Sequence, residues 1–148
     1  MAYNVILHFI LEPAKMRHWR FMDYHDPDGE NLIRKWYEAQ VPAVRAAVMW
    51  AIKEVEVTED LEASETFNRL KRKHIGLFSL RVSAPLGTRK RQFRPVGFWS
   101  LTSGDLILVG GCEKSGRVTI PPGAYENVLD IQLRYYLDGV GTIYDHFF

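Results

Sequence analysis

The chain has 148 residues, a length typical of a single domain, and its 47% hydrophobic and 25% charged residues are the balance of an ordinary globular protein. Its one cysteine, Cys112, excludes an internal disulfide and favours a reducing cytoplasm, and no apolar run reaches the roughly 20 residues that a membrane-spanning helix requires. The net charge of +1 conceals a strong segregation, because residues 1–65 carry 12 acids and 7 bases, residues 66–104 carry 9 bases and no acid, and residues 105–148 carry 6 acids and 3 bases.

The first part of the chain predicts two strands and a turn. The apolar run at 4–11, "NVILHFIL", lacks a basic leader and a small-residue cleavage site, so we expect a buried strand there and no signal peptide. Aromatic residues and alternation predict a second strand over His18–Tyr24. The sequence "HDPDGE" that follows combines Asp, Pro and Gly, which is typical of a turn.

Two helices in quick succession follow this turn. Apolar residues at helical spacing predict a helix over Asn31–Ala39, and Pro42, which is well tolerated at a helix start, begins a second helix that ends near Glu56. The apolar face of the second helix consists of Val44, Val48, Ala51, Ile52 and Val55. The sequence therefore predicts a helical hairpin.

The second half of the chain predicts three strands and a closing helix. The acidic segment 58–67 favours a loop or a helical turn, and the strands are expected over Leu77–Ser83, Arg89–Trp99 and Leu106–Gly111, with turns at 84–88 and 101–105. We expect the closing helix over Ala124–Leu137 and no periodic element in the last eleven residues. The fold class is α+β: a small, mainly antiparallel sheet with an N-terminal helical hairpin and a C-terminal helix.

The common motifs of metal, nucleotide and nucleophile chemistry do not occur in the sequence. The five histidines have no metal-ligand spacing, and neither a phosphate-binding glycine loop nor a serine elbow occurs. Cys112 follows a predicted strand, and a buried, inert thiol is the preferred interpretation of it. The charge distribution therefore carries the functional signal.

The most basic stretch coincides with the predicted strand Arg89–Trp99. Because alternate residues of a strand share a face, Arg89 and Arg91 lie with Phe93. The residues expected on the other face are Lys90, Gln92 and Arg94. A solvated edge strand that uses cations to prevent sheet-to-sheet pairing is one interpretation. The other is a surface that binds phosphates, and Arg81, the basic cluster at 69–74 and the acid-free segment favour it.

The order of these segments resembles the RelE/HigB superfamily of bacterial and phage toxins, most closely its phage-derived HigB-like branch. The likeness rests on "WRFMDYHDPDGENLIRKWYEAQVP" at 19–42, "FNRLKRKHIGLFSLRV" at 67–82, "RQFRPVGFW" with "LILVGGCEKSG" at 91–116, and "IPPGAYENVLDIQLRYYL" at 120–137. It covers residues 18–138, which leaves 1–17 as an N-terminal extension able to add a strand and 139–148 as a C-terminal tail.

The resemblance implies the toxin of a type II toxin–antitoxin system, a ribosome-dependent mRNA endonuclease of the bacterial cytoplasm. Such toxins cleave without metal or other cofactor through attack of the mRNA 2′-hydroxyl on the adjacent phosphate. The implied partners are mRNA on the ribosome and a small antitoxin protein, and no membrane is involved. Positioned cations and proton-transfer groups supply the catalysis in this scheme.

Carried over residue by residue, the resemblance implies that Arg81, Arg91 and Lys114 are catalytic. Tyr125, near the start of the closing helix, is a candidate acid or base, although packing is the commoner role of an aromatic residue there. The residues expected to bind nucleic acid are Lys71, Arg72, Lys73, Arg89, Lys90, Arg94 and Arg117.

The chain departs from the family's Gly-aromatic-x-Lys-Lys pattern at two positions. Cys112 stands in place of the aromatic residue and Ser115 in place of the second lysine, while Arg117 can substitute for that lysine. Two further functions therefore stay open. One is a catalytically inactive phage or bacterial protein of the same fold that binds RNA, the ribosome or a host protein. The other is a structural or assembly protein.

Overall fold

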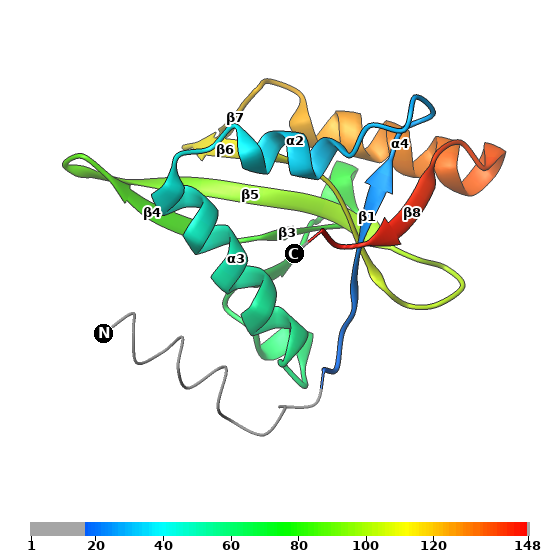
Figure 1. Cartoon of the computed structure of the whole chain (residues 1–148), viewed down its shortest axis with the longest axis horizontal. Helices are drawn as coiled ribbons and strands as arrows, with labels where there is room; N and C mark the ends of the chain where they lie inside the picture. Colours follow the sequence, from blue (N-terminus) through cyan, green and yellow to red (C-terminus); the bar gives the residue numbers. More distant parts are fainter. Residues whose placement is uncertain (1–16, 148) are drawn as a thin grey trace.

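The computed structural model describes residues 17–147 of the chain, so the strand expected at 4–11 lies outside the described residues. The described chain forms three α-helices and eight strands (Figure 1). The helices are α2 (Leu32–Glu38), α3 (Pro42–Glu56) and α4 (Ala124–Asp138). The strands are β1 (Phe21–His25), β2 (Phe67–Arg69), β3 (Leu77–Leu80), β4 (Val82–Leu86), β5 (Arg89–Trp99), β6 (Leu106–Ser115), β7 (Val118–Ile120) and β8 (Thr142–Asp145). Two short 3₁₀ helices are η1 (Leu61–Ala63) and η2 (Arg72–His74).

All eight strands belong to one sheet, and six of them follow the order β2-β3-β5-β6-β1-β8. Among the described strands only β1 and β6 pair in parallel. The long strands β5 and β6 continue past this set, where β4 pairs with β5 and β7 pairs with β6. In Figure 1, β5 runs across the molecule and the β4–β5 hairpin projects beyond the helices at the left. The α+β class and the mainly antiparallel sheet are confirmed, but the sheet is larger than the small one expected.

Hydrophobic residues pack on both faces of the sheet. On one face α2 and α3 cover side chains such as Phe78 and Leu80, and on the other α4 covers Leu77 and Phe98. We call the side covered by α2 and α3 the hairpin face, after the helical hairpin predicted for these two helices, and the other side the α4 face. The second helix of the predicted hairpin has the predicted bounds, Pro42–Glu56, and its five predicted apolar residues are all buried.

Close packing on the hairpin face depends on one glycine of β6. A Cβ atom at Gly111 would lie 2.2 Å from the indole ring of Trp36 in α2, so only glycine allows that ring to rest on the sheet. The strand therefore needs a residue without a side chain at this position, at some cost in backbone entropy.

The ends of the described chain meet at β1. Strand β8 pairs antiparallel with β1, although no element was expected in the last eleven residues. The buried carboxylate of Asp23 in β1 accepts hydrogen bonds from Asn31 Nδ2 at 2.8 Å and from the backbone N–H of Phe147 at 3.2 Å. The same carboxylate lies 2.5 Å from His146 Nδ1. Residues 142–147 are therefore bound to the same sheet as the rest of the domain.

Two other predicted elements differ from the structure. The single strand expected over Leu77–Ser83 is divided at Arg81 into β3 and β4, which pair with different parts of β5. The strand expected to end at Gly111 continues to Ser115 and forms a hairpin with β7. Within residues 17–147, no helix is long and apolar enough to cross a membrane.

Candidate nucleic-acid interface

A cleft of about 750 Å³ opens on the α4 face, between η2, the β6–β7 hairpin and the start of α4. The polar and charged side chains along its lining include Lys73, His74, Lys114, Arg117, Tyr125 and Glu126. Four of these residues, Lys73, Lys114, Arg117 and Tyr125, are among the site residues expected from the sequence. The fold thus gathers them from three segments that are well separated along the chain.

Local structure explains how each wall presents its side chains. Lys114 lies near the end of β6, where Gln92 of β5 and Thr119 of β7 flank it. The tight turn after β6 contains Gly116 with a φ of 60°, which glycine adopts without strain, and Arg117 extends from this turn. Helix α4 begins directly after Gly123 and places Tyr125 in its first turn.

The opposite wall is η2, which hydrogen bonds to α4. His74 Nε2 lies 2.9 Å from Glu126 Oε1, and Lys73 Nζ lies 3.5 Å from the same oxygen. The hydrogen bond with His74 is the main cause that lowers the pKa of the Glu126 carboxyl. Arg72 in η2 has a φ of 58°, a left-handed conformation that costs a non-glycine residue roughly 1–2 kcal/mol. The contacts of η2 with α4 hold this wall in place.

Tyr125 lies between the cleft wall and the sheet. The centroids of the Tyr125 and His74 rings lie 5.2 Å apart in an edge-to-face contact. Burial raises the pKa of the Tyr125 phenol. The phenol therefore stays protonated at neutral pH. Burial also raises the pKa of the Cys112 thiol to about 11, so this cysteine is protonated and buried, as expected for an inert thiol.

A row of polar residues continues from the cleft along the α4 face of the β4–β5 hairpin. Arg94 lies directly across from Cys112, and burial lowers the pKa of its guanidinium. Next to it, Gln92 Oε1 accepts a hydrogen bond from Ser83 Oγ at 2.9 Å. Alternation of β5 places Lys90 on this face as well. Arg81, at the break between β3 and β4, donates to Asn68 Oδ1 at 2.8 Å and is near enough to affect Arg94 electrostatically.

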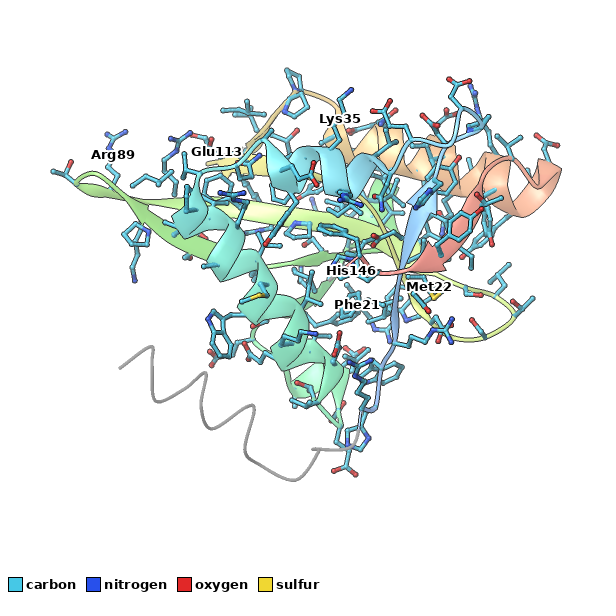
Figure 2. The ribbon with its side chains drawn as sticks, viewed as in Figure 1. Phe21, Met22, Lys35, Arg89, Glu113 and His146 are labelled. Carbon is cyan, nitrogen blue, oxygen red and sulfur yellow. The ribbon has the colours of Figure 1, made fainter. Side chains whose placement is uncertain are left out.

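Arg89 and Arg91 lie on the hairpin face, with Phe93. Arg91 forms a two-pronged ion pair with Glu113 of β6. Its Nε donates to Oε2 at 2.5 Å, and its Nη2 donates to Oε1. This hydrogen bonding raises the pKa of Arg91. Figure 2 shows Arg89 at the projecting end of the β4–β5 hairpin, with Glu113 nearer the body of the domain. The three residues expected to be catalytic are therefore divided between the two faces, with Lys114 in the cleft and Arg91 on the opposite side.

The remaining expected cations lie in the connection between β2 and β3. Lys71 and Arg72 are exposed beside the cleft wall that Lys73 and His74 form. Among the described residues, no ion pair with a carboxylate involves Lys71, Arg72, Arg81, Lys90, Arg94, Lys114 or Arg117. Most of the positive charge on the α4 face therefore has no carboxylate partner in the described chain.

His74 and Glu126 are the cleft residues that sequence reasoning missed. His74 ends the basic run at 69–74 and Glu126 follows Tyr125, so both adjoin residues that had been singled out. Their 52-residue separation concealed the pairing.

No three His, Cys, Asp or Glu side chains within residues 17–147 are grouped so that they could hold a metal ion. Comparison of the chain with known protein families, with curated proteins and with solved structures gave no match. The assignment of function therefore rests on the chemistry of the cleft and on the sequence.

Proposed function

We propose that the protein binds single-stranded RNA on its α4 face and cleaves it in the cleft. The observation that carries this proposal is the convergence of Lys114, Arg117 and Lys73 with His74 and Tyr125 around one hollow. Cations without carboxylate partners suit a polyanion, since the ligand then supplies the missing negative charge. Two groups able to exchange protons add the means for chemistry, which a binding surface alone does not need.

The proposed reaction begins with the RNA 2′-hydroxyl, which RNA carries and DNA lacks. The 2′-oxygen bonds to the adjacent phosphorus while its proton passes to His74. In the neutral tautomer whose Nε2–H donates to Glu126, Nδ1 of His74 carries no proton and can accept that of the 2′-hydroxyl. The bond from phosphorus to the 5′-oxygen then breaks, and Tyr125 donates a proton to that oxygen. The products are a 2′,3′-cyclic phosphate and a 5′-hydroxyl.

The cations act on the charge that develops in this reaction. The phosphate gains negative charge as the 2′-oxygen attacks, and Lys114 and Arg117 stabilise that charge from the β6–β7 side. Lys73 lies on the opposite wall, where Glu126 offsets part of its charge. Arg94 and Lys90 bind neighbouring phosphates along the β4–β5 hairpin.

The wider role that we propose is that of a toxin of the RelE/HigB type, with mRNA on the ribosome as the substrate and a small antitoxin as the inhibitor. Support comes from the sequence resemblance over residues 18–138 and from an α+β domain with two consecutive helices before its central strands. In this proposal the catalytic cations are Lys114 and Arg117. Arg81 contributes to binding, and Arg91 is structural because Glu113 already neutralises it.

Induced expression in a bacterial host tests this proposal. The wild-type chain should arrest growth, and both His74→Ala and the double variant Lys114→Gln, Arg117→Gln should relieve the arrest. The matched control is Arg89→Gln with Arg91→Gln, which removes the same charge from the other face and should still arrest growth. Equal arrest by all folded variants, verified by circular dichroism, would show that the cleft is not the active site.

A second candidate function is RNA binding without cleavage. The departures at Ser115 and Cys112 from the family's pattern favour it. Mapping of RNA ends separates the two functions. Cleavage creates new mRNA ends in cells that express the wild type and none in cells that express His74→Ala. Growth arrest without new ends would support binding alone.

A further inference from the structure

A second hollow adjoins the cleft at the start of α4. This crevice of about 300 Å³ lies between the middle of β5 and β6 and the first turns of α4, and it shares Pro122 and Gly123 with the cleft. Its lining includes Val96, Gly110 and Val128, and no charged side chain belongs to it. It is therefore smaller than the cleft and uncharged, and its lining carries polar as well as apolar surface.

The floor of the crevice is open because β6 has a glycine there. A Cβ atom built at Gly110 would meet no atom within 4 Å, although the residue lies in the interior of the sheet. The neighbouring glycine, Gly111, has its Cβ direction filled by Trp36, and that of Gly97 is filled by the backbone of Ile107. Gly110 is half-buried, so this unfilled position in the middle of the sheet opens into the crevice and is accessible to a ligand.

We propose that this crevice binds one nucleobase of the RNA whose phosphate lies in the basic cleft. The inference rests on the proposed function, because the cleft supplies the phosphate end of the same nucleotide. A base is flat, uncharged and mostly apolar on its faces, which matches a slot floored by Gly110 and walled by Pro121 and Pro122. A phosphate group would find no cation inside it.

Asn127 of α4 is the one residue with a polar side chain among those that line the crevice, and that side chain ends in an amide. An amide offers both a donor and an acceptor, the combination that reads the edge of a base. Asn127 lies on an exposed part of α4, one turn after Gly123, with its backbone N–H bonded to the Gly123 carbonyl at 3.0 Å. We assign it the role of discriminating between bases.

The test compares short single-stranded RNAs that differ only in the presence of one base. Binding is measured for an intact RNA and for RNAs with a single abasic nucleotide at successive positions. For the wild type, loss of the base at one position should weaken binding about 10-fold, within the range known for one bound base. Gly110→Val should bind the intact RNA as weakly as that abasic RNA. Lys114→Gln, the control, should weaken binding to both RNAs by the same factor.

Valine at Gly110 fills the crevice without meeting a neighbour at its Cβ, and Gly110→Ala is the smaller second variant if valine unfolds the chain. Asn127→Leu keeps an exposed helical residue and should abolish any preference in a panel of RNAs with each of the four bases at that position. RNA binding that ignores base loss at every position would overturn this inference and leave the proposed function standing. Failure to bind any RNA would overturn both.

Discussion

The division of basic residues between the two faces predicts how salt affects RNA binding. Each phosphate that a cation neutralises on single-stranded nucleic acid contributes a slope of about −0.7 to the logarithm of affinity against the logarithm of salt concentration. Besides Lys71 and Arg72 in the β2–β3 connection, five expected cations in the cleft and along the β4–β5 hairpin make no ion pair with a carboxylate in residues 17–147. They are Arg81, Lys90, Arg94, Lys114 and Arg117. The wild-type slope should therefore reach about −3.5 if all five bind phosphates.

Two pairs of substitutions measure the contribution of each face. Lys114→Gln with Arg117→Gln removes two cations from the cleft, so the slope should become less steep by about 1.4. Arg89→Gln with Arg91→Gln removes the same number of charges from the hairpin face. This control should change the slope by less than about 0.7, since Glu113 already neutralises Arg91.

Fluorescence anisotropy of a labelled single-stranded RNA, titrated at several salt concentrations, gives both slopes directly. Circular dichroism shows whether each variant keeps its fold, which matters most for the control because Arg91→Gln leaves Glu113 without its cation. The reasoning is refuted if the hairpin-face pair reduces the slope as much as the cleft pair. It is also refuted if the wild-type slope is near zero, since the α4 face would then bind no phosphate.

Three further predictions concern the fold that supports the cleft. The pKa of the Cys112 thiol is about 11 in the folded protein and 9.0 in the unfolded chain, so the unfolded thiol loses its proton first as pH rises. The free energy of unfolding should therefore fall by on the order of 2 kcal/mol in the window between these two pKa values. Urea unfolding of wild type and Cys112→Ala at both ends of the window isolates this loss, and identical pH dependence of the two proteins would contradict it. Gly111→Ala should destabilise the protein by about 1–3 kcal/mol because its methyl group collides with Trp36, and an unchanged urea midpoint would be the opposing result. Asp23→Ala should cost about 3 kcal/mol and free the C-terminal strand, because His146 and its neighbours lose a buried carboxylate. Faster proteolysis near residue 142 would verify this, and normal protection there would count against it.

Local patterns in the sequence were sufficient to predict the helices. Pro42 and the apolar spacing that follows it specify α3 completely, because a helix depends on residues three and four apart. Strand pairing depends on distant residues, and there the sequence was less informative. Nothing in residues 142–145 indicates that their partner is β1, more than 100 residues earlier. The division at Arg81 likewise reflects how β3 and β4 pair with β5.

The candidate site was predictable in its charges but not in its geometry. Alternation separated Arg91 from Arg94 correctly, because the period of a strand is local. The partner of Arg91 was not predictable, since its contact with Glu113 depends on the register between β5 and β6. The His74–Glu126 contact depends on α4 returning to the β2–β3 connection, which only the folded chain reveals.

The most direct test of the central claim is the chemistry of RNA ends in a translation reaction with the purified protein. Wild type should generate fragments with a 2′,3′-cyclic phosphate on one side of the cut and a 5′-hydroxyl on the other, and His74→Ala should generate none while still binding RNA. Replacement of the single 2′-hydroxyl at the mapped cut by hydrogen should stop cleavage there. Intact RNA with folded wild-type protein, or cleavage that persists without that hydroxyl, would contradict the proposed reaction in the cleft.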